Sequence, residues 1–329
     1  MDNMVHIFSR EDENRGCTKE TCDPSKSVYG YEPNLGATIF FFILFTVSGA
    51  VYLWQGIKTK TQFFTGAMIL GAISEVLGYV AKFILHNDPF SDLGFKMSVV
   101  LLTFAPAFYS AGIYYTLKHI WSVSELFPLL DLDSHCYSIT FGSDFSRLRP
   151  AWYTYIFISC DIFSILLQAA GGALASAAND MTLLDIGDNV MIAGLALQVV
   201  TLVVFGLFAA DYAIAAYRNR TRLNPSTEKL RNSPRFKFFL VALWVAFLCI
   251  LLRSAYLVAE LAGGWVHNEI LRNQILFICL DSLPIGLAAV VMNVWHPGYC
   301  FPRSEQEAVI AEEKMMRNSS GSDEEARIQ

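Results

Sequence analysis

Ionisable side chains occur near the middle of otherwise apolar segments of this sequence. Glu75, Asp161, Arg253 and Asp281 each lie in such a position, and Glu260 follows Arg253 at i+7. Placing one Asp, Lys or Arg at the centre of a membrane helix costs about 2.5–3.5 kcal/mol. Several such groups facing lipid would together cost on the order of 10 kcal/mol, which is comparable to the whole stability of a typical domain. We therefore expect these side chains to face the interior of a helix bundle.

Helical spacing gathers the polar residues onto common faces. Three sets share spacings of three, four or seven residues: Glu75, Tyr79 and Lys82; Asp161, Ser164 and Gln168; and Arg253, Tyr256 and Glu260. Together with Asp281 and Asn293, they allow four helices to present polar edges to one central cavity. The candidate substrate-pathway residues are therefore Glu75, Tyr79, Asp161, Gln168, Arg253, Tyr256, Glu260, Asp281 and Asn293. The alternative is that they are ties between helices, each worth about 0.6–2 kcal/mol.

The usual signatures of catalysis and cofactor binding are absent from the sequence. It has no Gly-rich phosphate loop followed by Lys and Ser/Thr, and no Gly-x-Ser-x-Gly elbow. The histidines do not form the multi-ligand set that a catalytic metal would need. We expect no enzymatic activity, no cofactor and no metal. Nucleic acid is not an expected partner either, because no basic stripe with stacking aromatics is present.

The elements that must position these residues are seven apolar segments. Hydrophobic residues make up 54% of the 329 residues and charged residues only 16%, against about 25% charged residues in soluble domains. A membrane span needs about 20 mainly apolar residues, and segments this long and evenly apolar favour helices over barrel strands. The sequence therefore predicts an all-α, polytopic seven-transmembrane helix bundle. Its spans lie at about 35–55, 63–85, 97–120, 152–178, 189–213, 238–261 and 270–294.

Basic residues predict the orientation of this bundle. Lys and Arg concentrate in the segments that follow spans one, three and five. Seven of these basic residues lie within 214–237. Because short cytosolic loops are enriched in Lys and Arg, the N-terminus is expected outside and the C-terminus in the cytosol. The chain then divides into an extracellular tail (1–34), the bundle (35–296) and a cytosolic tail (297–329). The basic loop 214–237 is expected to hold anionic lipid.

Short motifs in order along the chain resemble the fungal lipid-translocating exporters, a seven-span family named after a member linked to 7-aminocholesterol resistance. The matching pieces are Tyr31-Glu32-Pro33, Glu75-x-x-Gly78-Tyr79, Ala105-Pro106, Ala111-x-x-Tyr114, the run from Asp161 to Gly172, Arg253-x-x-Tyr256-x-x-x-Glu260, Asp281-x-x-Pro284 and Asn293-x-x-His296-Pro297-Gly298. They cover roughly residues 31–300. The segment near 121–150 departs from the family pattern because it is longer and more acidic.

This resemblance implies transport of amphipathic lipids, such as sphingoid long-chain bases or sterol-like toxic amphiphiles. Resistance would follow from export or from altered leaflet distribution. A cationic head group would suit a cavity lined by Glu75, Asp161 and Asp281, with Arg253 holding one acid in place. Two alternatives remain open: a seven-span receptor, and a sensor or regulator of lipid asymmetry that carries nothing. The plasma membrane is the expected location, with internal membranes as the alternative.

Overall fold

The computed structural model describes residues 22–23, 27–124, 150–178, 181–218, 233–264 and 268–300. In these residues, seven long helices form a bundle. Each of the seven is long and apolar enough to span a membrane. The first six are α2 (Leu35–Thr59), α3 (Gln62–Asn87), α4 (Asp92–Ser124), α6 (Pro150–Ala177), α7 (Met181–Arg218) and α9 (Pro234–Ala262). The seventh is composite and consists of α10 (Gln274–Leu276), the π-helix η3 (Phe277–Ser282), α11 (Leu283–Val294) and α12 (Pro297–Cys300). The predicted all-helical seven-span fold is confirmed, and the protein is an integral multi-pass membrane protein.

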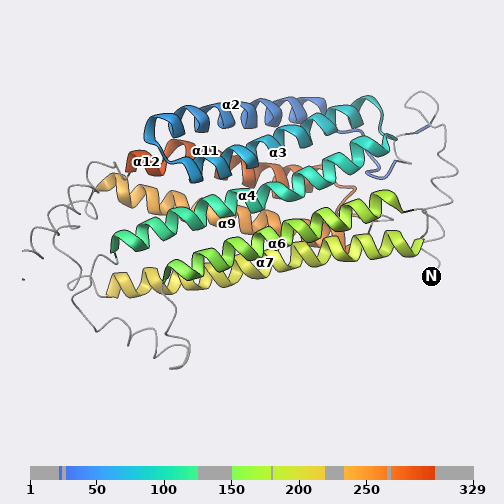
Figure 1. The fold of residues 1–329 in the computed structure, drawn as a ribbon. Coiled ribbons are helices and arrows are strands. Elements are labelled where there is room, and N and C mark those ends of the chain that lie inside the picture. Colours follow the sequence, from blue (N-terminus) through green and yellow to red (C-terminus); the bar gives the residue numbers. More distant parts are fainter. Residues whose placement is uncertain are drawn as a thin grey trace, which may run out of the picture.

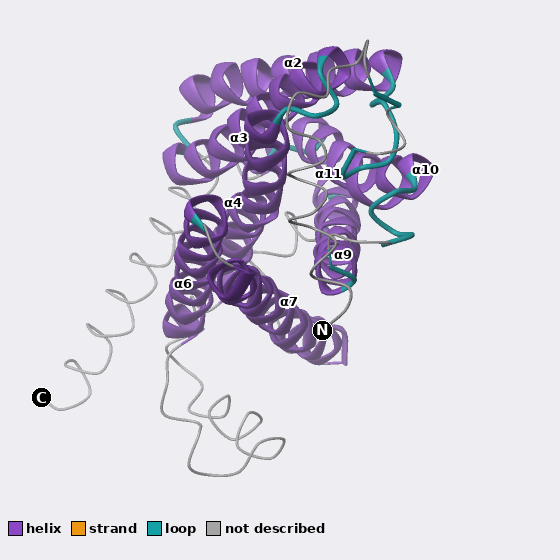
Figure 2. Ribbon diagram, turned by 90° about the vertical axis from the view of Figure 1, so that its right-hand side faces the viewer, coloured by secondary structure: helices purple, strands orange, loops and turns teal. Residues whose placement is uncertain are grey.

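The helices run side by side along one axis and form a closed ring (Figures 1 and 2). Each spanning helix packs on the next one along the chain, and α11 closes the ring by packing on α2. The pair α4 and α9 also touches across the ring. Because successive spans are antiparallel, α2 begins and α3 ends at one end of the bundle, called here the Leu35 end. The opposite end is called the Thr59 end.

Local signals explain where several helices begin and end. The side chain of Asn34 caps α2, since its Oδ1 accepts a hydrogen bond from Ala37 N at 3.1 Å. Lys60 ends the same helix in a left-handed conformation with φ of 56°. Asn273 caps α10 by accepting from Ile275 N and Leu276 N at 3.1 and 3.2 Å. Pro234 starts α9 at a position where its missing N–H costs nothing.

Most of the helices extend beyond the apolar segments expected from sequence. Helix α4 begins at Asp92 rather than near 97, and α7 runs from Met181 to Arg218 rather than from 189 to 213. Hydropathy detects only the part of a helix that contacts lipid, whereas backbone hydrogen bonding continues through its polar ends. The last span begins at Gln274 rather than near 270, after a turn that ends at the Asn273 cap.

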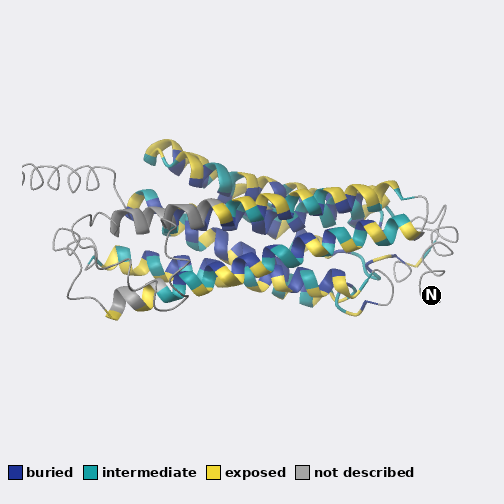
Figure 3. Ribbon diagram, turned by 60° about the horizontal axis from the view of Figure 1, so that its bottom comes forward, coloured by how far each residue is buried: buried dark blue, intermediate teal, exposed yellow. Residues whose placement is uncertain are grey.

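The outer surface of the bundle is apolar and its interior is aromatic. Large side chains such as Phe40, Leu207 and Val294 are more than half exposed. Figure 3 shows exposed positions along the outer faces of the helices. Inside the ring, Phe45 and Tyr52 are fully buried. An apolar exterior over a packed interior is the arrangement that lipid requires, because the acyl chains solvate the outer side chains.

Helices α6 and α7 approach closely through two glycines. A Cβ atom built on Gly171 would lie 2.5 Å from Met191 N and 2.6 Å from Gly187 O. The reverse also holds, since a Cβ on Gly187 would lie 2.5 Å from Ala175 N. Small residues at such crossings let membrane helices gain van der Waals contact between their backbones.

We expect Gly171→Val to destabilise the protein by about 1–3 kcal/mol, because backbone atoms on α7 cannot move aside as a side chain could. The matched control is Gly66→Val on α3, where a Cβ meets nothing within 4 Å. Thermal unfolding of both variants in the same detergent checks this. Equal melting temperatures for the two would contradict the close α6–α7 contact.

Parts of the predicted domain division lie outside the described residues. They comprise most of the tail 1–34, residues 125–149 of the segment near 121–150, residues 219–232 of the basic loop 214–237, and residues 301–329. At the described edges, Lys58, Lys60, Arg218, Arg235 and Lys237 all lie at the Thr59 end. The inside–outside orientation itself stays a prediction.

Candidate functional site

Arg253 lies at the centre of the bundle and joins three helices. It is completely buried on α9 and forms ion pairs with Glu75 of α3 and Asp281 of η3. The distance from Arg253 Nε to Asp281 Oδ1 is 2.8 Å, and Arg253 Nη2 donates to the backbone oxygen of Leu102 on α4 at 2.9 Å. We call Glu75, Arg253 and Asp281 the charge triad. All three side chains have 0% exposure, so each charge depends on its partners rather than on water.

The approach of α3 to α4 helps to position the triad. Gly71 and Gly78 lie one turn before and after Glu75, and Cβ atoms there would meet Tyr109 at 2.8 Å and Leu102 at 2.6 Å. The missing side chains let α4 lie close to α3 at the level of Glu75. The carbonyl of Leu102 can therefore reach the guanidinium that Glu75 binds.

The π-helix positions Asp281. Leu283 N donates to Ile278 O, a wider turn than in an α-helix, and Pro284 follows without an N–H of its own. Asp281 and Ser282 are both fully buried within this widened turn. The sequence motif Asp281-x-x-Pro284 therefore corresponds to a local break in helix geometry at the site, a feature often found at functional positions.

A second layer of polar side chains lies between the triad and the Leu35 end. Tyr79 donates to Ser282 Oγ at 2.8 Å, and its ring stacks on Phe41 and Phe45 with centroid distances of 5.7 Å. Lys82 lies nearly one turn further along α3 and is 97% buried. Glu260 is also buried, two turns from Arg253 on α9, and Tyr256 lies between them.

The Tyr79–Ser282 hydrogen bond should contribute a measurable but small coupling. We expect Tyr79→Phe and Ser282→Ala each to destabilise the protein, with a coupling of about 0.5–1.5 kcal/mol in a double-mutant cycle. Apparent unfolding free energies of the two single variants and the double variant in one detergent provide the measurement. Strict additivity would show that this bond does not hold α3 against η3.

The remaining predicted residues lie in separate contacts rather than at the triad. Asp161 accepts a hydrogen bond from Ser110 at 2.6 Å, and Gln168 donates to Gln198 at 2.9 Å. Asn293 donates to Ser48 at 2.6 Å near the Thr59 end. The predicted polar residues thus lie in several separate contacts between helices and do not all line one central cavity.

Several residues in these contacts were not predicted from the sequence. Ser110, Gln198 and Ser282 are polar residues within apolar spans, and only that composition could have indicated them. Tyr29 precedes the first span and gave no signal. Its ring lies against Lys82, with Nζ 3.8 Å from the ring centroid.

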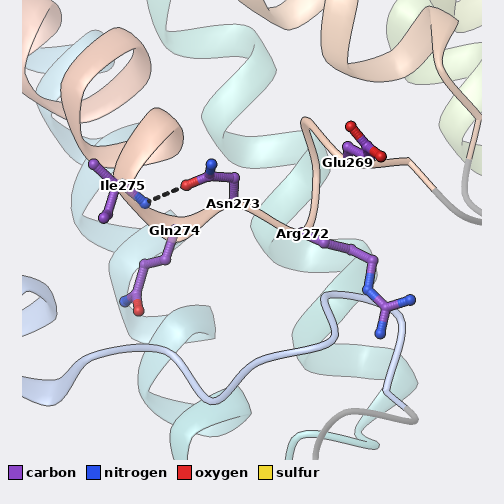
Figure 4. Close-up of a pocket in the computed structure, with 5 residues that line it drawn as sticks. All are labelled: Glu269, Arg272, Asn273, Gln274 and Ile275. Carbon is purple, nitrogen blue, oxygen red and sulfur yellow. Dashed lines mark hydrogen bonds between the residues drawn. The ribbon is translucent and has the colours of Figure 1, made fainter.

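Two hollows lie between the Leu35 end and this layer. The first is an open depression of about 610 Å³ formed by Glu269, Arg272, Asn273, Gln274 and Ile275 (Figure 4). The second is a crevice of about 20 Å³, enough for one water molecule. Tyr31, Thr38, Tyr79, Lys82, Phe277 and Ser282 contribute to its lining. Gln274 borders both hollows.

Metal binding finds no support in the part of the chain that the structure describes. Its His, Cys, Asp and Glu side chains form no group of three that could hold an ion. The arrangement is suited instead to binding a cation or proton near buried carboxylates, or to fixing the helices in place.

Comparison with known proteins identifies relatives in yeast. The sphingoid long-chain base transporter RSB1 of Saccharomyces cerevisiae is 30% identical over 311 residues, covering 86% of this chain and 76% of that protein. Protein RTM1 is 25% identical over 81% of this chain and 90% of its own length. Protein RTA1 is 25% identical over 87% and 90%. No solved structure matches the chain.

The chain matches the family described as "RTA1 like protein" over residues 68–304, which include most of α3, the five spans that follow it and all members of the charge triad. The resemblance to this fungal family seen in the sequence motifs is thereby confirmed. The chain belongs to the RTA1-like family of membrane proteins.

Proposed function

We propose that this protein moves an amphipathic amine, most simply a sphingoid long-chain base, across the bilayer. The observation that carries this proposal is an excess of buried acids. Among the described residues the buried carboxylates are Glu75, Asp161, Glu260 and Asp281, whereas the buried Lys and Arg side chains are Lys82 and Arg253. A carboxylate inside a membrane bundle must be neutralised by a proton or by a cation. The amine of a sphingoid base is such a cation.

The two hollows provide a route for that amine from the Leu35 end. Gln274 borders both the open depression and the crevice, and the crevice is also lined by Tyr79 and Ser282. Ser282 follows Asp281 directly, so a head group at this point would lie next to the charge triad. The hydroxyls of Tyr79 and Ser282 offer hydrogen bonds to the hydroxyl groups of a sphingoid head. The crevice is narrow, so entry of a lipid head requires α2, α3 and η3 to move apart around it.

The relative RSB1, a sphingoid long-chain base transporter that aligns with 86% of this chain, supports the same class of substrate and supports transport rather than catalysis. We further propose the plasma membrane as the location, with the Leu35 end outside. The basic residues at the Thr59 end would then lie in the cytosol, and the loop 214–237 would contact anionic lipid.

The alternative is a sensor or regulator of lipid asymmetry that carries nothing. A charge triad that only ties three helices together would be consistent with this alternative. The two functions differ in one respect, which is whether the protein alone moves lipid.

The test is leaflet-resolved movement of a fluorescent sphinganine in liposomes that contain only the purified protein. We expect movement well above that in protein-free liposomes, and competition by unlabelled sphinganine but not by N-acetylsphinganine, which lacks the charge. A parallel sample has a pH gradient across the liposome membrane, so that a proton-coupled carrier is also detected. Folded protein that moves no sphinganine under both conditions would reject the proposal in favour of a sensor or regulator.

A further inference from the structure

Lys82 is an ammonium group enclosed by aromatic rings inside the bundle. Its Nζ lies 3.8 Å from the ring centroid of Tyr29 and 4.3 Å from that of Phe277, and the side chain is 3% exposed. Among the described residues, Nζ has no hydrogen-bond acceptor. A lysine this close to a helix end would ordinarily extend toward the interface or pair with a carboxylate.

The surroundings of Lys82 are those by which proteins bind ammonium ligands. Two aromatic faces attract a cation, and desolvation strengthens that attraction. Glu260 and Asp281 are buried carboxylates within electrostatic range of Lys82. We call Tyr29, Phe277, Glu260 and Asp281 the ammonium cage.

A short segment closes the cage at the Leu35 end. Residues 27–33 cross this end of the bundle, and the ring of Tyr29 packs edge-on against Phe95 at 5.2 Å. A Cβ atom on Gly30, whose φ is +68°, would overlap the guanidinium of Arg272, so the segment also lies against the border of the open depression. Pro33 O is 2.9 Å from His86 Nδ1 on α3. The segment is therefore held against α3, α4 and Arg272.

Lys82 also borders the crevice that leads from Gln274 toward Ser282. A head group following that route would meet the Lys82 ammonium before it reached Asp281. Two cations cannot share one cage, so Lys82 must leave when an amine enters. Its four-carbon stem is long enough to extend toward the Leu35 end, where the head groups of lipids would solvate it.

We infer that the ammonium cage is the substrate amine site and that Lys82 is a built-in competitor that occupies it until a sphingoid amine displaces it. This inference rests on the proposed function. In the resting protein Lys82 balances part of the negative charge of the cage and keeps the crevice closed. Transport then consists of exchanging one ammonium group for another, so the net charge of the interior does not change.

Binding of sphinganine to the full-length protein in zwitterionic nanodiscs tests the inference. Removing the competitor with Lys82→Met should tighten binding about tenfold, the effect of losing one or two cation–π contacts. Binding of N-acetylsphinganine should not change, because it has no ammonium group. The matched control is Lys96→Met, a partly exposed lysine on α4 whose Nζ is 3.5 Å from Ser176 O. Its affinity for sphinganine should equal that of the wild type.

A second measurement uses the unaltered protein, so it does not depend on folding of a variant. Trimethylated sphinganine keeps the positive charge but does not react with acylating reagents. Adding it should raise the acylation rate of Lys82, followed by mass spectrometry, about tenfold relative to Lys96. An unchanged ratio of the Lys82 and Lys96 acylation rates would show that Lys82 does not leave the cage.

The outcomes separate the inference from the proposed function. In one outcome the wild-type protein binds sphinganine, Lys82→Met binds it equally or more weakly, and acylation of Lys82 does not change. This outcome would overturn the competitor role and leave the proposed transport unaffected. Failure of folded wild-type, Lys82→Met and Lys96→Met proteins to bind sphinganine at all would overturn both. Tighter binding of the amine alone, with faster acylation of Lys82, supports the inference.

Discussion

Replacing Arg253 with Met is expected to lower the melting temperature of the protein by on the order of 10 °C. The substitution keeps the apolar volume of the side chain but leaves Glu75 and Asp281 without their shared partner. Breaking a buried ion pair by removing one member costs about 3–5 kcal/mol, because the remaining charge is buried and uncompensated. In a protein of this size that cost corresponds to a shift of this order.

Two further variants make this expectation specific to the triad. Arg235→Met removes an exposed guanidinium from the first turn of the same helix and should change the melting temperature little. The triple variant Glu75→Gln, Arg253→Met, Asp281→Asn removes all three charges and should recover at least half of the loss. Thermal unfolding in one detergent gives all four values. A triple variant less stable than Arg253→Met alone would show that the packing of these side chains, rather than their charge, dominates.

Asp281→Asn is expected to reduce sphinganine movement at least tenfold while leaving the protein folded. The substitution preserves shape and leaves Arg253 paired with Glu75, but it removes one carboxylate from the cage and from the triad. Two unit charges about 4 Å apart at an effective dielectric constant of 20 attract by about 4 kcal/mol, so even a fraction of that attraction amounts to tenfold or more. The liposome assay measures the effect.

The control for this variant is Asp185→Asn, an acid that lies in the first turns of α7 at the Leu35 end but is only partly buried. It should transport sphinganine as the wild type does. A melting temperature within a few degrees of the wild type would separate lost function from lost fold in Asp281→Asn. Unimpaired transport by a folded Asp281→Asn protein would remove this carboxylate from the pathway.

The sequence alone determined the number of spans and which residues share a helix face. A run of about 20 apolar residues is a local property, and so is the spacing of Glu75, Tyr79 and Lys82 along one helix. Mid-span acids and bases also had to face inward, because lipid cannot solvate them. For the same reason the sequence could indicate that Arg253 has an acidic partner.

Only the tertiary structure decided which acids those partners are. Glu75 and Asp281 reach Arg253, whereas Asp161 accepts from Ser110. All three acids occupy comparable mid-span positions, so their sequence context does not distinguish them. The choice depends on the order of helices around the ring and on the rotation of each helix about its axis. Both are set by packing between segments far apart in the chain, including the glycines that bring α4 close to α3.

The cage around Lys82 was equally invisible in the sequence. Tyr29 lies ahead of the first span and Phe277 begins a π-helix in the last one, nearly 250 residues away in the chain. Neither residue carries a local signal of cation binding, because an aromatic ring serves lipid contact, core packing and cation binding alike. What makes these two rings a cation site is that both lie within 4.3 Å of one ammonium group, and that arrangement exists only once the ring of helices has closed.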